Sequence, residues 1–297
     1  MRFASPRLWL YTSAIILVVI GLRVLIIKFF HIKEVASSVK NIIWSEEFVV
    51  PNVVHYIFFN KDVDFMAFLS ILSVIKVQHP ERLVIHCNCK SFSGRYWSSL
   101  KAIPSVELHY LSQPTHVYGQ VLSSVYHATD VARIMVLMEW GGIYVDSDVI
   151  LIQCLDEFRH YEMALGWPHG QYIGTQILLA RKGAQFLSLW LDGYRRYQPR
   201  AWYYNAGQYP TEQILEKHPG LVHYERVVFG VHNLLDKLYG TAPWPEWHNM
   251  TAIHTLGRHH PAPQNMNETF VLNYKTPFGE IARWVLYELE PKIIPQR

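Results

Sequence analysis

The hydrophobic pattern divides the chain into one long apolar segment and a longer region where apolar runs alternate with helical stretches. Residues 9–27 are apolar apart from Arg23, close to the roughly 20 residues needed to span a bilayer. We expect a transmembrane signal anchor there, after a cytoplasmic tail (1–8) and before a stem (28–49). The segment exceeds the roughly 7 to 15 apolar residues of a cleaved signal peptide, and no convincing small-x-small cleavage site follows it.

The pattern after residue 50 predicts alternating strands and helices. The apolar run 53–59 is typical of a central parallel strand, 83–87 predicts the next buried strand, and 143–145 predicts a third. A helical stretch (65–77) ends before His79-Pro80. This alternation predicts an α/β sheet whose ligands bind at the carboxyl ends of the strands. Residues 50–297 suffice for one large α/β domain with a substantial core.

Composition narrows the function classes. The 297 residues are 50% hydrophobic and 17% charged, with a net charge of +3. The chain has no basic run, repeat or low-complexity tract, so nucleic-acid binding has no support. Cys87, Cys89 and Cys154 are too few for a disulfide framework and lack zinc-site spacing, although one disulfide with one free thiol is compatible with them.

Asp146 and Asp148 follow a double glycine and a short apolar run, within residues 139–148. Alternate residues of a strand face the same side, so both carboxylates should face one site. Their attachment points would lie about 6.6 Å apart, whereas two oxygens on one Mg-like ion are at most about 4.2 Å apart. The side chains must converge, or one must act through water. Such a cation keeps positions for substrate phosphates, so a nucleotide diphosphate is the expected ligand; a solvated turn is the alternative.

The preceding residues 129–142 predict a helix that is capped by Thr129 and ends at Gly141 or Gly142. Its apolar residues run almost all the way round, which indicates burial. Asp130 and Arg133 share one face, so we do not expect both in bulk water. A purely structural pair near the positive end of the helix is the alternative.

Together, Asp130-x-x-Arg133 and the segment from Gly141 to Asp148 resemble the "SD..R…GGIYxDxD" motif of family 32 glycosyltransferases of the GT-A fold. This group includes yeast Golgi mannosyltransferases and vertebrate α-1,4-galactosyl and α-1,4-GlcNAc transferases. Residues 49–58 resemble the start of the same domain. The resemblance implies a Rossmann-like, mixed, mostly parallel sheet flanked by helices, a nucleotide-sugar donor, a divalent cation such as Mn²⁺, and retention of anomeric configuration.

The resemblance also implies roles for the motif residues. Asp130 and Arg133 would hold the donor sugar as catalytic residues. Asp146 would serve the ribose of the nucleotide and the metal, and Asp148 would bind the metal directly.

Weaker matches extend this assignment. The first strand, with His55 and Tyr56, would present backbone to the nucleotide base, although by residue type His55 is more typical of a packed core. Gln176 lies in a segment (174–186) that resembles the family's next strand, and it would position a sugar hydroxyl unless it is an ordinary hydrogen-bonding residue. The segment 251–255 resembles "AIHHW", whose first histidine, here His254, lies near the phosphates or metal. The second histidine and the tryptophan are absent here, but Arg258 and its two histidine neighbours could contact a diphosphate.

Aromatic residues suggest sugar stacking or, equally, core packing; they are Trp202, Tyr203, Tyr204, Trp244 and Trp247. The neighbouring segment 205–211 lies where relatives have a turn at the acceptor cleft, and its Gly207 and Pro210 also fit a plain loop.

We therefore expect a metal-dependent glycosyltransferase that acts on a glycan, glycolipid or glycoprotein acceptor. Membrane anchoring and two sequons, at Asn249 and Asn267, fit a single-pass type II glycoprotein of the Golgi membrane with a luminal catalytic domain.

Two alternatives remain. The run 143–151 also matches the nucleophile strand of haloacid dehalogenase phosphatases, where the first Asp is phosphorylated, but an acidic magnesium pair and the expected motif order are missing. A membrane-anchored carbohydrate-binding protein without turnover is the second alternative, against which the intact motif argues.

Overall fold

The computed structural model describes residues 48–230 and 233–288. The expected tail and anchor, and the stem up to residue 47, lie outside these ranges. Within the described ranges, no helix combines the length and apolar character that a membrane crossing requires.

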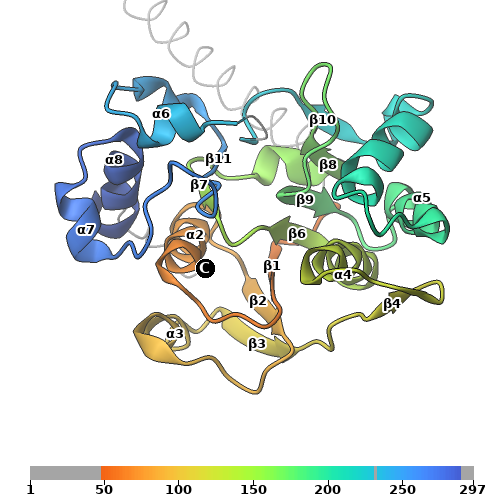
Figure 1. The fold of residues 1–297 in the computed structure, drawn as a ribbon, viewed down its shortest axis with the longest axis horizontal. Coiled ribbons are helices and arrows are strands. Elements are labelled where there is room, and N and C mark those ends of the chain that lie inside the picture. The colour runs from red at the N-terminus through yellow and green to blue at the C-terminus, as the bar shows by residue number, and fades with distance from the viewer. Residues whose placement is uncertain (1–47, 231–232, 289–297) are drawn as a thin grey trace, which may run out of the picture. The chain divides into compact units, whose positions relative to one another are not determined.

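A seven-stranded sheet with the order β10-β8-β9-β6-β1-β2-β3 forms the centre of the described part (Figure 1). Neighbouring strands are parallel except where β9 pairs with β6 and β8. The expected mixed, mostly parallel sheet is therefore confirmed, as is the central position of β1. Its strands are β1 (Val53–Phe58), β2 (Arg82–Cys87), β3 (Val106–Tyr110), β6 (Gly142–Val145), β8 (Met163–Gly166), β9 (Ile177–Ala180) and β10 (His223–Glu225).

Two small antiparallel ladders accompany this sheet, and the first of them bears on function. It pairs β7 (Val149–Leu151) with β11 (Ala252–His254), while the second pairs β4 (His116–Val117) with β5 (Gln120–Val121).

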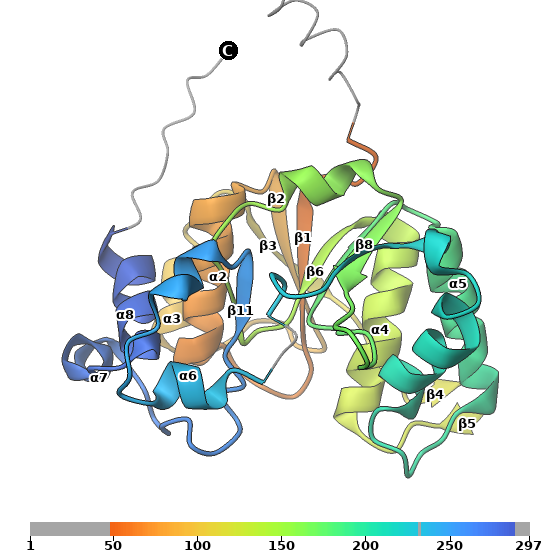
Figure 2. The same cartoon turned by 90° about the horizontal axis from the view of Figure 1, so that it is seen from above.

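Helices flank the sheet on both faces. The α-helices are α2 (Phe65–Gln78), α3 (Gly94–Leu100), α4 (Val125–Trp140), α5 (Gln185–Asp192), α6 (Leu235–Tyr239), α7 (Glu268–Asn273) and α8 (Pro277–Arg283). Single turns of 3₁₀-helix occupy Asp156–His160, Gly193–Arg196, Pro219–Leu221 and Pro245–Asn249, and π-helical turns occupy Tyr204–Gln208, Pro210–Leu215 and Trp284–Glu288. Figure 2 shows α2 and α3 on one side of the strands, with α4 and α5 on the other.

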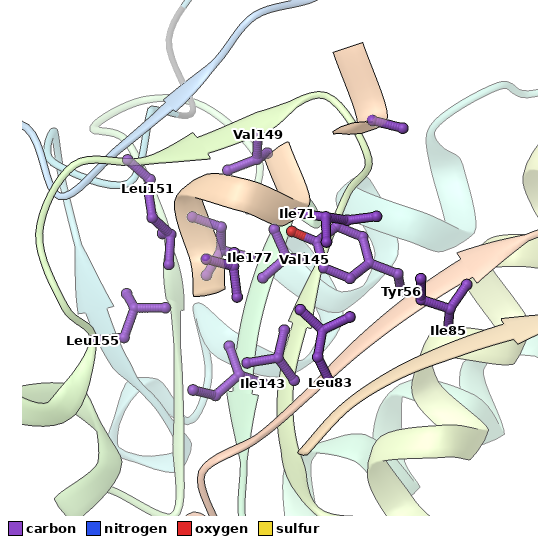
Figure 3. Close-up of a cluster of buried hydrophobic side chains, with 14 of the residues drawn as sticks. Tyr56, Ile71, Leu83, Ile85, Ile143, Val145, Val149, Leu151, Leu155 and Ile177 are labelled. Atoms are coloured by element: carbon purple, nitrogen blue, oxygen red, sulfur yellow. The ribbon is translucent and has the colours of Figure 1, made fainter. Parts of the chain in front are cut away.

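Successive side chains of the central strands point to opposite faces of the sheet, and both faces are buried. Alternate β1 and β2 side chains, such as Tyr56 and Leu83, pack with Ile71 of α2 in one cluster (Figure 3). The intervening β1 residue Ile57 packs with Val131 and Ile134 of α4 in the other. A strand covered on both faces reads as a continuous apolar run, which is why the sequence of β1 identified it.

The helix ends follow from capping, with one correction. Asp64 accepts a hydrogen bond from the Ala67 N–H (2.8 Å) at the start of α2, and α2 ends before the predicted stop at residues 79–80. Helix α4 ends at Trp140, as predicted, but the cap expected at Thr129 was wrong. Ser124 caps α4 instead, whereas the Thr129 hydroxyl donates to the Val125 carbonyl (2.9 Å) inside the helix.

Three histidines, which we call the histidine row, cross β1, β2 and β3 beneath the end of α4. His55 Nδ1 lies 3.0 Å from His86 Nε2, and His86 Nδ1 lies 3.3 Å from His109 Nδ1. His55 Nε2 donates to the Gly141 carbonyl (3.0 Å), and Trp140 packs edge-on against all three rings. Burial lowers the pKa of His55 to about 4 and that of His86 to about 3. Both are neutral core histidines near pH 7.

A disulfide joins Cys87 to Cys89 at the end of β2, and Cys154 is an exposed free thiol.

Candidate active site

Asp146 and Asp148 lie in a tight turn that joins β6 to β7. Asp146 follows the last residue of β6, and the Val149 N–H, at the start of β7, donates to the Asp146 carbonyl (3.1 Å). The expectation that strand alternation aims both carboxylates was therefore wrong. The chain reverses through Ser147, and this turn brings the two carboxylates to one place.

His254 joins the two carboxylates. One carboxylate oxygen each of Asp146 and Asp148 and one ring nitrogen of His254 all lie within 4.8 Å of one another, and His254 Nε2 is 3.2 Å from Asp148 Oδ1. His254 reaches this place because β11 pairs with β7, which sets His254 opposite Val149. The Thr255 N–H and hydroxyl both donate to the Asp148 carbonyl, each at 2.8 Å. A strand from a distant part of the chain thus fixes the turn.

This donor set fits a divalent cation. Ligand atoms on a cation with bonds of about 2.1 Å lie no more than about 4.2 Å apart, so the three side chains need only a small movement to share one. Two carboxylates suit Mg²⁺ or Mn²⁺, while an imidazole favours transition metals over Mg²⁺. The combination suits a divalent cation.

Charges around Asp148 keep it ionised. Burial alone would raise its pKa, but the positive charges of His254, Lys61 and Arg258 lower the pKa to about 2. Burial acts to lower the pKa of His254, yet Asp148 attracts the proton more strongly and the net shift is upward. His254 Nε2 and Asp148 Oδ1, 3.2 Å apart, thus stabilise each other's charged forms, and an incoming cation would take the place of this contact.

Arg133 connects the helix to the metal turn. Its guanidinium lies 3.0 Å from Asp130 Oδ1 and 3.4 Å from Asp146 Oδ1, and it donates to the Thr175 carbonyl (2.7 Å). The side chains of Arg133 and Asp130 are 7% and 13% exposed, so the pair is shielded from bulk water as the sequence predicted. Burial opposes the charge on Arg133, but Asp146, Tyr144 and Asp130 more than offset this and raise its pKa. Burial also raises the pKa of Asp130, and Arg133 counteracts it.

Two residues at the site were not identified from the sequence. The Tyr144 hydroxyl donates to Asp146 Oδ1 (2.6 Å), and its ring lies under the Arg133 guanidinium, 4.6 Å from the centroid. Tyr144 precedes Asp146 by two residues along β6, so strand alternation could have suggested it. Lys61 donates to the Ser147 hydroxyl (2.7 Å) from the loop after β1, a contact that no local pattern encodes.

Gln176 and Tyr56 support the turn from behind. The Gln176 amide donates to the Phe229 carbonyl (3.1 Å), and its own carbonyl accepts from the Asp146 N–H (2.9 Å). The Tyr56 hydroxyl bonds Ser70 (3.0 Å), whose hydroxyl donates to the Asp146 carbonyl (3.4 Å). Both side chains are buried. The structure therefore places Gln176, Tyr56 and the core residue His55 behind the site, with their side chains engaged by protein partners.

The aromatic candidates separate clearly. Trp244 and Trp247 are core residues, at 7% and 1% exposure, whereas Trp202 is 54% exposed. The Tyr203 hydroxyl donates to the Ile173 carbonyl (2.6 Å). A narrow crevice beside Trp202 is lined by Asp130 among others. A surface hollow of about 410 Å³ lies elsewhere, against α7, and none of the predicted site residues lines it.

Comparison with known proteins shows similarity to a glycosyltransferase family and to a curated relative. Residues 41–164 match a family described as "Glycosyltransferase sugar-binding region containing DXD motif". This segment contains Asp130, Arg133, Asp146 and Asp148, and it ends before His254. The chain is 24% identical over 223 residues to "Glucan organizing enzyme 1" of Cryptococcus neoformans var. grubii serotype A. The alignment covers 67% of this chain and 56% of the relative, so the chain spans little more than half of the relative's length.

Similar solved structures include the glycosyltransferase GlyE of Streptococcus pneumoniae TIGR4, with a TM-score of 0.46, 12% identity, and coverage of 82% of this chain and 66% of GlyE. They also include the galactosyltransferase LgtC in complex with donor and acceptor sugar analogues. It has a TM-score of 0.42, 13% identity, and coverage of 82% of this chain and 98% of LgtC.

Proposed function

We propose that the chain is a glycosyltransferase that uses a divalent cation to transfer a sugar from a nucleotide-sugar donor to a carbohydrate acceptor. The match of residues 41–164 to a glycosyltransferase sugar-binding region that contains a DXD motif supports this proposal. The observation that carries this proposal is the convergence of Asp146, Asp148 and His254 within 4.8 Å, next to the buried Asp130–Arg133 pair.

The cation would be held by Asp148, Asp146 and His254. When bound, it supplies positive charge that stabilises the leaving diphosphate. Lys61, which donates to the Ser147 hydroxyl, is positioned to contact phosphate oxygens.

Arg133 and Asp130 would orient the donor sugar. A carboxylate accepts hydrogen bonds from sugar hydroxyls and a guanidinium donates them. Because both side chains are almost buried and bonded to each other, they lose little conformational freedom on binding. Arg133 also contacts Asp146 (3.4 Å), so the same side chain connects the proposed sugar-binding residues to the cation site.

The proposed stereochemical outcome is retention. It rests on the resemblance of the motif segment to family 32 enzymes, and none of the described residues is assigned as a nucleophile. A phosphatase mechanism would need Asp146 free to attack phosphorus, whereas Tyr144 and Arg133 both engage its carboxylate. That contact and the family match favour sugar transfer.

We also propose a luminal catalytic domain. The exposed side chain of Asn249 supports this proposal. Asn267 caps α7 through its oxygen, which accepts from the Phe270 N–H, rather than through the nitrogen to which a glycan would be attached. Treatment with an amide-cleaving glycosidase tests occupancy, because removal of N-linked glycans increases the mobility of the protein on a gel. A protein expressed in eukaryotic cells that carries no glycan at either sequon would count against this location.

The proposed activity is tested by nucleotide release from a panel of nucleotide sugars, with water as the acceptor. We expect release that requires Mn²⁺, is abolished by EDTA, and falls at least about 100-fold in Asp148→Asn, because even outer residues of metal sites alter activity about 10- to 100-fold. The matched control is Asp192→Asn, which removes a carboxylate that is 59% exposed and paired with Arg195. Undiminished release by Asp148→Asn would refute the proposal. Binding of nucleotide sugar without release would instead identify an inactive binding protein.

A further inference from the structure

An exposed pair of aromatic rings lies beside Asp130. Tyr126, in the first turn of α4, is 47% exposed, and Trp202, just before the π-helical turn Tyr204–Gln208, is 54% exposed. Their ring centroids are 4.9 Å apart at an angle of 67°. His127 and Asp130, on the same helix end, line the crevice that Trp202 borders.

A cation connects this pair to the catalytic centre. The Arg258 guanidinium lies 5.0 Å from the Tyr126 ring centroid and 5.7 Å from that of Trp202. Trp202 in turn lines one crevice with Asp130. The two rings, Arg258 and Asp130 therefore belong to one surface.

The backbone that carries Trp202 is held firmly. His127 Nε2 donates to the Trp202 carbonyl (3.2 Å), so its Nδ1 accepts from the Tyr197 hydroxyl (2.6 Å). Asn205 accepts from the Gln198 N–H (2.9 Å) and donates to the Gly193 carbonyl (3.3 Å). A ring on a fixed backbone binds with a small entropic cost, which favours a binding role for Trp202.

The order of groups across the site indicates what this surface binds. Lys61 contacts Ser147 and His254 contacts Asp148, whereas Arg133 joins Asp146 to Asp130. A donor with its diphosphate at Asp148 and its sugar at Asp130 would thus approach the aromatic pair with its sugar end rather than its base. The molecule that meets that sugar is the acceptor.

We propose that Tyr126, Trp202 and Arg258 form the acceptor subsite, in which an acceptor pyranose lays its apolar C–H face on the aromatic rings and directs hydroxyls to the guanidinium. The two aromatic rings offer a large apolar surface beside the polar Arg258 guanidinium. A pyranose has a matching apolar C–H face with hydroxyl groups around its edge. This proposal rests on the proposed sugar transfer, because the donor's orientation defines the acceptor side.

The test titrates methyl glycosides of galactose, glucose, mannose and N-acetylglucosamine onto the chain by ligand-observed NMR, without metal or nucleotide. Trp202→Ala and Tyr126→Ala are compared with wild type. The matched control is Tyr287→Ala, which removes an aromatic ring that is 55% exposed on the terminal π-helical turn. We expect at least one glycoside to bind wild type and the control equally, and to bind each site variant about three- to tenfold more weakly.

A second arm separates the acceptor role from stacking of the nucleotide base and from failure of the proposed activity. Affinities for UDP and GDP with Mn²⁺ are measured by calorimetry on the same proteins. Unchanged nucleotide affinity in Trp202→Ala supports the acceptor subsite. Weakened nucleotide affinity with unchanged glycoside affinity would overturn it in favour of base stacking, and a wild type that binds no glycoside up to its solubility limit would also overturn it. If no nucleotide binds wild type, the proposed transfer fails, while the glycoside titration still decides whether the rings bind sugar.

Discussion

Replacing Arg133 with Met should destabilise the fold far more than an average substitution. The Arg133 side chain is 7% exposed, and two carboxylates depend on it, Asp130 at 3.0 Å and Asp146 at 3.4 Å. Met has a similar apolar stem but no charge. The variant therefore leaves Asp130, which is 13% exposed, without its opposite charge, and also removes the donor to the Thr175 carbonyl.

The magnitude follows from the cost of breaking a buried ion pair. Removing one partner of such a pair costs about 3–5 kcal/mol, of which a lost hydrogen bond to a buried carbonyl accounts for about 1–3 kcal/mol. Arg133→Lys keeps the charge but not the planar fork, so we expect a smaller loss. In the double variant Asp130→Asn/Arg133→Met the lone charge is gone, and part of the loss should be recovered through a coupling energy of about 0.5–3 kcal/mol.

Urea unfolding in EDTA, followed by circular dichroism, measures these free energies without a contribution from bound metal. Comparison of Arg133→Met with Asp130→Asn/Arg133→Met gives a second test. The double variant has fewer native contacts than the single variant, yet we expect it to be the more stable of the two. A loss below about 1 kcal/mol for Arg133→Met would refute it, as would a double variant that is the less stable.

Three further outcomes are expected. Gly142→Ala should lower the free energy of unfolding by more than about 2 kcal/mol, because φ is +105° and a Cβ would lie 2.4 Å from the Val53 carbonyl oxygen. The control Gly170→Ala, where φ is +68° and no atom lies within 4 Å of the added Cβ, should lower it by only about 1 kcal/mol. Equal urea midpoints for the two variants would contradict this. Tyr144→Phe removes the 2.6 Å bond to the Asp146 carboxylate and should weaken Mn²⁺ binding in a calorimetric titration about 10-fold or more, with unchanged affinity as the contrary result. The two buried members of the histidine row have pKa values lowered from 6.5 to about 4 and about 3, so below pH 6.5 the unfolded chain binds protons that the folded chain excludes. Stability should be greatest above pH 6.5 and fall by about 1.4 kcal/mol per pH unit for each histidine as the pH decreases towards 4; urea midpoints that stay constant between pH 7 and 5 would contradict the assignment.

The local hydrophobic pattern and residue spacing predicted β1 and the pairing of Asp130 with Arg133. The central strand β1 reads as a continuous apolar run because helices cover both of its faces. The proximity of Asp130 and Arg133 followed from helical spacing. The start of α4 was misplaced because Thr129 and Ser124 are equally good caps by residue type, and only the observed bond to the His127 N–H identifies Ser124.

The rest of the site depends on long-range contacts. Pairing of β11 with β7 brings His254 to Asp148, and nothing in either segment specifies the other. Lys61 reaches Ser147 in the same way. The turn at Ser147 was only the alternative interpretation, because an apolar run that ends in Asp-x-Asp fits a continuing strand as well as a turn.

Binding of Mn²⁺, measured by electron paramagnetic resonance in the presence of a nucleoside diphosphate, tests the central claim most directly. The account predicts one tightly bound ion per chain, which is lost in Asp148→Asn and bound more weakly in His254→Gln. The control Asp192→Asn, which changes an exposed carboxylate paired with Arg195, should bind the ion like wild type. The same stoichiometry and affinity in wild type and Asp148→Asn would contradict it.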